Sequence, residues 1–369
     1  MKFEIERKFL LDVLGVGGSM SGKSKVLPIL DSCKVVLGGG RIIVSSYDGE
    51  NAVLKACSVI KHDSDFSFCV NGADITKAVK SVRDAVLEFI INEDSHVLII
   101  KHMKGFMELP YESADEFPVV DSVNDGMRLD IDSELLWSWL NKARNFAASD
   151  ALRPILCGVN LYVHGNEYGV CASDSSCMFV DSAYMGGDVI GNVNAVIPNG
   201  AISAVMCAIN GSDVTSVRIN ERNISFSTNE SRVVCRRLEG NFPNFKAVLP
   251  KSHSVEVRLA RTDLLDAVNR AKLFSNEGTC LCVLETMSGE LGVTAQNLDM
   301  SKKSVESCVA SISGNIRIGV KGSLLSQCLS VMEDESVVVE MNGASYPIIF
   351  RENGKDNQQI LLMPLMLQN

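Results

Sequence analysis

The sequence lacks any long apolar run. Within its 369 residues no stretch reaches the roughly 18 consecutive apolar residues of a membrane-spanning helix, so we expect no membrane association. The first residues are also charged where a secretory signal would need an apolar segment, as at Lys2, Glu4 and Arg7. Both features predict a cytoplasmic protein.

An excess of positive charge is missing too. Lys and Arg number 35 against 45 Asp and Glu, which gives a net charge of −10. This balance excludes a protein that coats nucleic acid with its whole surface, because such binding needs a basic surface. A basic patch confined to one face remains compatible with the composition.

Motifs for metal binding and catalysis are absent. The 12 cysteines form no CxxC pair and no Cys/His knuckle, and most lie in apolar runs such as Val205–Ala208, as expected of buried thiols in a reducing compartment. We also find no HExxH motif, no nucleophile elbow and no spaced pair of histidines. The sequence therefore predicts no metal, no cofactor, no catalytic residue and no enzymatic activity.

One motif points elsewhere. Residues 17–24 read GGSMSGKS and match the phosphate-binding pattern G-x-x-x-x-G-K-[ST]. That loop works where a strand enters it and a helix leaves it, so that backbone amides converge on phosphate. Here Ile5–Leu14 has the apolar spacing of a helix, and residues 25–30 look β-like with a proline at position 28. A P-loop nucleotide-binding protein is therefore the alternative hypothesis, and a flexible Gly/Ser loop is favoured.

Internal repeats are the stronger signal. Pro28, Gly39 and Asp48 recur as Pro154, Gly165 and Asp174, each 126 residues later. Around Gly165-Asn166, alternating apolar residues predict a β-hairpin. A fainter third copy has its hairpin turn at Ser288-Gly289, at an offset near 123 from the second.

Helices repeat with the hairpins. Amphipathic stretches precede each hairpin, and Ser133 and Thr262 are the expected N-caps of the second and third. The expected helices cover 5–14, 75–85, 133–147, 202–209, 262–274 and 324–332. We therefore predict an α+β fold of three tandem domains, each with two helices packed on antiparallel sheet, bounded at 1–126, 127–254 and 255–369.

Several dispersed segments resemble the bacterial β sliding clamp family, the processivity subunit of the replicative DNA polymerase. They lie in order along the whole chain: Leu27–Leu30, Arg153–Leu156, Glu239–Pro250, Ser275–Glu277 and Leu361–Leu367. The resemblance implies a head-to-tail homodimer whose six domains form a ring around double-stranded DNA in the nucleoid. It also implies partners that bind through short linear motifs: the replicative polymerase, the clamp loader and repair polymerases.

The resemblance carries three sets of residues. DNA-facing cations on predicted helices and in the Gly/Ser loop would contact phosphate without sequence preference: Lys23, Lys25, Lys77, Lys80, Arg83, Lys142, Arg144 and Arg270. The dimer interface would include Phe106, Leu273 and Phe274. The peptide-binding pocket would involve Leu156, Ser173, Ser175, Ser176, Cys177, Met178, Pro243, Ala247, Val248, Leu361, Leu362, Met363, Pro364 and Leu365.

The chain departs from the family in this pocket. Family members usually read Thr-Asp-Gly-His-Arg-Leu where this chain has residues 173–178, SDSSCM, and Arg where it has Ala247. The apolar anchors Leu156, Val248 and Met363 keep their character, so we expect the pocket to bind peptides with an altered preference. A clamp-shaped peptide scaffold without a DNA role is the remaining alternative.

Overall fold

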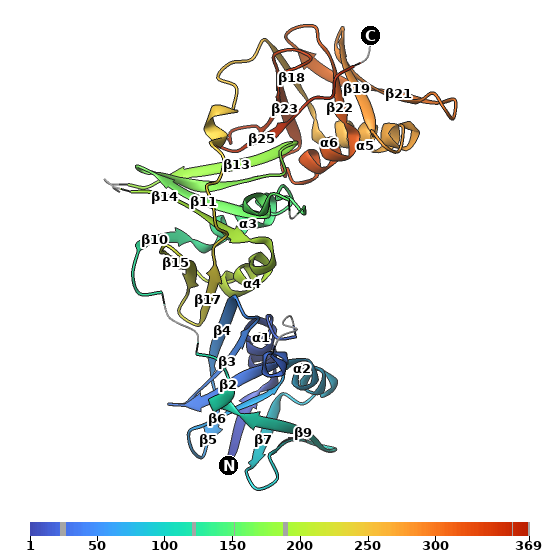
Figure 1. The fold of residues 1–369 in the computed structure, drawn as a ribbon. Coiled ribbons are helices and arrows are strands. Elements are labelled where there is room, and N and C mark those ends of the chain that lie inside the picture. Colours follow the sequence, from blue (N-terminus) through green and yellow to red (C-terminus); the bar gives the residue numbers. More distant parts are fainter. Residues whose placement is uncertain (23–26, 120–122, 151, 187–190, 356, 368–369) are drawn as a thin grey trace. The chain divides into compact units, whose positions relative to one another are not determined.

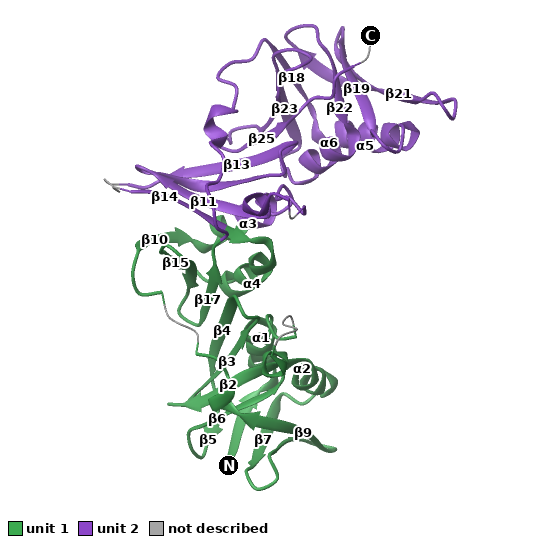
Figure 2. Cartoon of the chain, in the orientation of Figure 1, with its two compact units in different colours: residues 1–138, 197–237 green, residues 139–196, 238–369 purple. Residues whose placement is uncertain are grey.

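The chain folds into two compact units, each described by itself (Figures 1 and 2). The structure, a computed structural model, describes all residues except 23–26, 120–122, 151, 187–190, 356 and 368–369. Unit 1 contains Met1–Ser138 and Ile197–Arg237, and unit 2 contains Trp139–Val196 and Leu238–Asn369. The second of the predicted repeats is thus divided between the two units.

The three predicted repeats share one order of helices and strands, apart from the extra short strand β5 in the first. The first contains β1 (Lys2–Glu6), α1 (Arg7–Gly17), η1 (Pro28–Asp31), β2 (Ser32–Gly38), β3 (Arg41–Tyr47), β4 (Asn51–Ser58), β5 (Lys61–His62), β6 (Phe66–Asn71), α2 (Gly72–Ser81), β7 (Val86–Asn92), β8 (Val97–His102), β9 (Gly105–Ser113) and η2 (Ala114–Glu116). The second contains β10 (Met127–Asp132), α3 (Ser133–Ala143), η3 (Pro154–Leu156), β11 (Gly158–His164), β12 (Glu167–Ser173), β13 (Cys177–Tyr184), β14 (Asn192–Pro198), α4 (Asn199–Ile209), β15 (Val214–Ile219), β16 (Asn223–Ser227), β17 (Ser231–Arg236) and η4 (Phe245–Ala247). The third contains β18 (Val255–Ala260), α5 (Arg261–Ala271), η5 (Lys272–Phe274), β19 (Leu281–Met287), β20 (Glu290–Asn297), β21 (Lys302–Ile312), β22 (Arg317–Lys321), α6 (Gly322–Ser330), β23 (Ser336–Met341), β24 (Ile348–Glu352) and β25 (Gln359–Leu362).

Glycine fixes the hairpin turn of each repeat. Gly39, Gly165 and Gly289 have φ values of 57°, 64° and 78°, in the left-handed region that two-residue hairpin turns require. The flanking strands pair directly, as in His164 with Glu167 and Met287 with Glu290. The hairpins predicted from the sequence are confirmed.

One sheet in each unit crosses the boundary between repeats. In unit 1 β4, the strand that follows the β2–β3 hairpin, pairs with β17, the last strand of the second repeat. The sheet has 13 strands. In unit 2 β13 pairs with β25, the last strand of the third repeat, and the sheet has 12 strands. The compact units straddle the repeats because backbone hydrogen bonds join each repeat to the next.

Helices cover the sheets through their apolar faces. In the first repeat Leu10, Val13 and Leu14 of α1 join Ile75 and Val79 of α2 in one buried cluster with the strands. Such amphipathic packing is what the helical spacing in the sequence predicts. The α+β class, with helices on antiparallel sheet, is thus as predicted.

Some local predictions are wrong. Ser133 does not cap α3, because its hydroxyl bonds Thr215 at 2.7 Å while Asp132 accepts from the Leu135 amide at 2.8 Å. Thr262 is not a cap either, since α5 begins at Arg261 directly after a strand. Residues 28–31 form a 3-10 turn rather than a strand.

Candidate functional site

The predicted pocket residues gather where β13 meets β25 in unit 2. Cys177 pairs with Leu362 and Met178 with Leu361, so two segments far apart in the sequence become neighbours. Beyond the ladder, the amide of Met363 donates to the carbonyl of Ser176 at 2.8 Å. The strand pairing thus brings the 173–178 segment and the C-terminal 361–365 segment together.

A buried apolar cluster supports this surface. Met178 and Leu361 pack with Phe245 and Tyr162, and the partly buried Phe242 packs against them. Phe245 belongs to η4, whose flanking residues Pro243 and Val248 are exposed. The cluster therefore fixes the 243–248 turn next to the strand ends and completes the surface.

A tight turn forms the polar edge of the surface. One carboxylate oxygen of Asp174 accepts from the amides of Ser176 and Cys177 at 2.8 and 2.7 Å. Ser175 has φ 79°, a left-handed conformation, and its hydroxyl accepts from the guanidinium of Arg153 at 2.6 Å. Arg153 was absent from the predicted set, although it opens the Arg-Pro-Ile-Leu segment that carries the resemblance.

Exposure divides the predicted pocket residues into an accessible group and a supporting group. Met363 is 37% exposed and Val248 50%, so both side chains can contact a ligand. The other accessible residues are Ser173, Ser175, Ser176, Pro243, Ala247, Pro364 and Leu365. The buried supporting residues are Leu156, Cys177, Met178, Leu361 and Leu362.

The chemistry at this surface is apolar and unreactive. Burial raises the pKa of the Cys177 thiol, which keeps it protonated and unable to act as a nucleophile. Among the described residues no group of three or more His, Cys, Asp or Glu could hold a metal ion. The arrangement fits recognition of an apolar segment rather than catalysis.

The predicted DNA-facing cations fall into two groups. Lys77 and Lys80 are exposed on α2, and Arg83 is exposed just after that helix ends at Ser81. Arg144 is exposed after α3, whereas Arg270 pairs with Glu306 at 2.7 Å, which offsets its charge. Lys23 and Lys25 lie outside the described residues.

Lys142 is a correction. Its side chain is 5% exposed and its ammonium lies 3.0 Å from a carboxylate oxygen of Glu333, so it is not accessible to a phosphate. Lys142 lies three residues after the buried Trp139, at the edge of the apolar stripe of α3. That position indicates burial only weakly in the sequence, because a lysine at the edge of an apolar stripe usually extends its charged group into solvent.

The predicted interface residues are exposed apolar side chains. Phe106 on β9 is 64% exposed, and Leu273 on η5 is 72% exposed, with Phe274 beside it at 40%. Exposed large apolar groups of this kind mark association surfaces when they cluster. Leu273 and Phe274 are neighbours, and Phe106 belongs to the other unit.

The P-loop alternative finds no support in the fold. The helix α1 enters the Gly/Ser segment, and η1 followed by β2 comes after it. A phosphate loop needs the opposite order, with a strand before it and a helix N-terminus after it.

In the described part of the chain, no helix is long and apolar enough to cross a membrane.

Three family comparisons cover nearly the whole chain. The N-terminal domain of the DNA polymerase III beta subunit matches residues 1–121, the central domain 130–244, and the C-terminal domain 246–366. The predicted boundaries at 126/127 and 254/255 fall close to these limits and stay a prediction.

Individual relatives and solved structures agree. The chain is similar to the beta sliding clamp of Bacillus subtilis, at 23% identity with 99% of each chain covered, and to that of Pseudomonas putida, at 22% with 100% of each covered. A crystal structure of the Pseudomonas aeruginosa sliding clamp bound to griselimycin shares the fold, with a TM-score of 0.94, 21% identity and full coverage of both chains. The Thermotoga maritima beta subunit gives a TM-score of 0.91 at 20% identity, again over both whole chains. The chain belongs to the family of the DNA polymerase III beta subunit, the beta sliding clamp, a non-catalytic processivity factor.

Proposed function

We propose that two copies of this chain close head to tail into a ring around duplex DNA and tether polymerases through the surface at β13 and β25. The observation that carries the proposal is a pairing rule in the sheets. In the first and second repeats, the strand that follows the hairpin pairs with the last strand of the next repeat: β4 with β17, and β13 with β25.

The rule leaves one strand edge open at each end of the chain. Residues 302–309 of β21 pair with β20, and among the described strands only its last three residues pair with β18 on the other side. Residues 105–110 of β9 likewise pair with β8 alone among the described strands. Open edges of this length are unusual in a monomer because they invite pairing with another chain.

Continuing the rule gives a register for the dimer. If β21 corresponds to β13 and the partner's β9 corresponds to β25, the two strands pair in the same register. Val305 then lies opposite the partner's Phe106, and Lys303 lies opposite the partner's Glu108. Both pairs are exposed in the single chain, and they match in character: apolar with apolar, cation with anion. Cross-strand pairs of these kinds stabilise antiparallel sheets.

A charge exchange tests the register. We expect wild-type protein to have about twice the 40.0 kDa chain mass in light scattering at micromolar concentration. Lys303→Glu and Glu108→Lys should each weaken the dimer, because like charges then face each other, and the double variant should restore it. A strictly monomeric wild-type chain would contradict the ring, whereas failure of the double variant to recover would contradict only this register.

DNA encirclement is supported by the cations of α2. Lys77, Lys80 and Arg83 place three accessible positive charges within seven residues of a chain that is acidic as a whole. Contacts of this kind neutralise phosphates without reading sequence. Clamps loaded on nicked circular DNA with a clamp loader should be retained and should slide off after linearisation. Equal retention on linear DNA, or none on the circle, would favour a peptide-binding scaffold without a DNA role.

The peptide surface has its own test. A fluorescent peptide from the C-terminus of the cognate replicative polymerase should bind the wild-type chain, and Met363→Ala should weaken binding because an accessible apolar anchor is lost. Met287→Ala is a matched control, since Met287 on β19 is 44% exposed, close to the 37% of Met363. Equal loss in both variants would count against the assignment.

A further inference from the structure

We infer that Lys142 is a positioning residue for the peptide surface: from α3 it holds the start of β25, and so the C-terminal wall of that surface, in place against β13. The inference rests on the peptide-binding role proposed above. It gives a function to a buried lysine that does not itself reach the surface.

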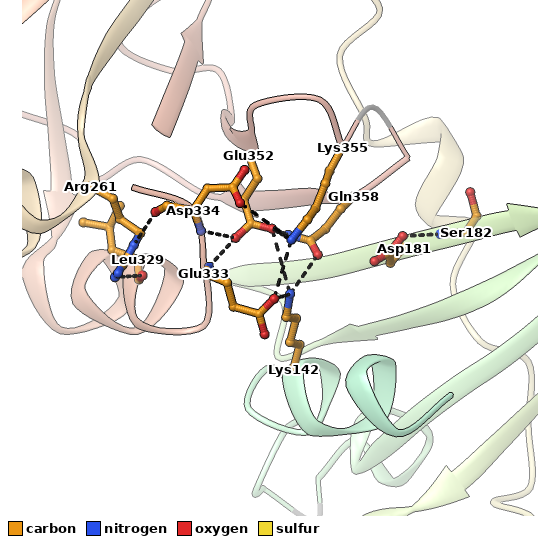
Figure 3. Close-up of polar contacts among 10 residues, drawn as sticks. All are labelled: Lys142, Asp181, Ser182, Arg261, Leu329, Glu333, Asp334, Glu352, Lys355 and Gln358. Atoms are coloured by element: carbon orange, nitrogen blue, oxygen red, sulfur yellow. Dashed lines mark hydrogen bonds and ion pairs between the residues drawn. The ribbon is translucent and has the colours of Figure 1, made fainter. Parts of the chain in front are cut away.

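Lys142 ends in a buried polar network from the third repeat (Figure 3). Its ammonium lies 3.0 Å from a carboxylate oxygen of Glu333 and 3.9 Å from one of Glu352, and it donates to the side-chain carbonyl of Gln358 at 3.3 Å. Lys142, Glu352 and Gln358 are each at most 5% exposed. Buried charges persist only where they are paired and hydrogen-bonded, so these contacts fix their partners firmly.

Glu352 connects the network to the strands. One of its oxygens accepts from the amides of Glu333 and Asp334, and the other accepts from Lys355 at 2.7 Å and from the Gln358 amide group at 2.8 Å. Glu352 is the last residue of β24, and Gln358 directly precedes β25. The network therefore closes the loop between β24 and β25 and sets where β25 begins.

Three residues further along β25, the chain reaches the peptide surface. Gln359 pairs with Val180, and the same ladder continues to Leu361 with Met178 and Leu362 with Cys177. Met363 follows at once. A shift at Gln358 would thus pass directly to the anchor residue, because a strand transmits displacement along its length.

The chain after α3 reaches the opposite wall. Phe146 stacks on Phe179 of β13 with ring centroids 5.7 Å apart. The amide of Ala148 donates to the carbonyl of Leu156 at 2.8 Å, and the carbonyl of Asn145 accepts from Gln327 of α6. The end of α3 consequently touches both walls of the peptide surface, with Lys142 as its contact to β25.

Loss of Lys142 should displace β25 without unfolding the chain. Lys355 and two backbone amides would still neutralise and hydrogen-bond Glu352, and Glu333, whose side chain is 64% exposed, would turn to solvent. Among the three residues that Lys142 contacts in the network, only Gln358 would lose a hydrogen-bond donor to a buried side-chain carbonyl, while Asp181 of β13 would lose a nearby positive charge. The effect should therefore appear in ligand binding more than in folding.

The experiment measures affinity for the polymerase peptide in full-length Lys142→Met, with the melting temperature recorded in parallel. We expect binding about tenfold weaker, a loss typical of groups that orient a binding residue. Lys142→Arg, which keeps a cation, should recover most of the affinity. Lys55→Met is the matched control. Lys55 lies on β4 in the other unit, is 7% exposed and is ion-paired to Asp12 at 2.6 Å.

The outcomes separate the possibilities. Weak binding in Lys142→Met with normal binding in Lys55→Met supports the inference. Unchanged binding in Lys142→Met, or equal losses in both variants, overturns it. If Lys142→Met fails to fold, Gln358→Met answers the question instead, since it leaves the Lys142–Glu333 pair intact: weak binding supports the inference and unchanged binding overturns it. Failure of the wild-type chain to bind the peptide refutes the proposed function, a result distinct from any of these.

Discussion

One strand position recurs in the three repeats with three different residues. Lys55 faces Val44 across the hairpin of the first repeat, Asp181 faces Val170 in the second, and Glu306 faces Val293 in the third. Lys55 pairs with Asp12 of α1, and Asp181 feels the positive charge of Lys142 on α3. Glu306 pairs with Arg270 of α5 at 2.7 Å. The residue before Glu306, Val305, is 64% exposed, and its segment of β21 pairs with β20 alone among the described strands.

The comparison teaches what each junction between repeats requires. Where β17 or β25 closes the edge, a charge on the strand is balanced by an opposite charge on a helix, with the signs exchanged between the two junctions. At the open edge of β21 the strand charge and its helix partner are both present, and the difference lies at the neighbouring position: Val180 is 5% exposed beside β25, whereas its match Val305 is 64% exposed. The third junction is thus suited to burial against another chain, and changes at the matched positions can test that reading.

The largest effect is expected at Glu352. Glu352→Ala should lower the free energy of unfolding at pH 7 by about 3–5 kcal/mol, because Lys355 and two backbone amides lose their acceptor and the buried Lys142 loses an opposite charge. Hydrogen bonds from Lys355 and from those amides outweigh the effect of burial and lower the pKa of Glu352 to about 2. The difference should therefore fade as the pH falls from 4.5 toward 2.

The matched change at the first junction is Asp12→Ala. Its carboxylate is 56% exposed, so we expect a loss of about 1 kcal/mol in urea unfolding. Equal losses for Glu352→Ala and Asp12→Ala would show that the two junctions do not differ in the way their contacts suggest.

A second pair of variants compares the apolar filling of the junctions. Phe179→Ala should cost about 3–4 kcal/mol, since a fully buried ring that stacks on Phe146 is removed. The matched residue of the first repeat is Val53, which is also buried, and Val53→Ala should cost about 1.5 kcal/mol. Thermal and urea unfolding measure both; a reversed order would contradict the packing described for β13.

Asp181 gives a change of opposite sign. Burial raises its pKa from 3.8 to about 6, although the Ser182 amide and Lys142 favour the carboxylate. The folded chain then holds this proton more tightly than the unfolded chain, so stability falls as the pH rises through that window. Asp181→Asn should raise the free energy of unfolding at pH 7 by about 1–2 kcal/mol. At pH 4 the gain should be near zero, and a gain independent of pH would contradict the assignment.

The smallest effect on stability is expected at Val305. Val305→Thr should change the unfolding of the monomer by less than about 0.5 kcal/mol, because the side chain is exposed there. The same change should weaken the proposed dimer severalfold, which sedimentation equilibrium over a dilution series measures. A loss of monomer stability without a change in dimer affinity would contradict the placement of Val305 in the dimer contact.

The sequence predicted best what is local and repeated. The turn glycines could be found because two-residue turns demand positive φ, and the helix before Gly17-Gly18 could be distinguished from a strand by its apolar spacing. The caps at Ser133 and Thr262 were wrong because each helix follows a strand without a connecting loop, so that both residues already lie inside the helix.

Lys142 shows why the rest could not be predicted. Its hydrogen-bond partner Gln358 lies 216 residues later in the chain, so no local pattern relates them. Its position on a helix end among other cations suggests a solvated side chain. The exposure of Met363 and the burial of Leu361 likewise depend on the pairing of β13 with β25, which joins different repeats.

The continuity of the two sheets has a mechanical consequence for the proposed dimer. At β4 with β17 and at β13 with β25, a covalent connection keeps the strands at a high effective concentration, of millimolar order for short linkers. The contact between β21 and β9 has no such tether, and its occupancy depends on protein concentration. Dilution, or a factor that pulls on the ring, would open it at this contact while the other junctions stay closed.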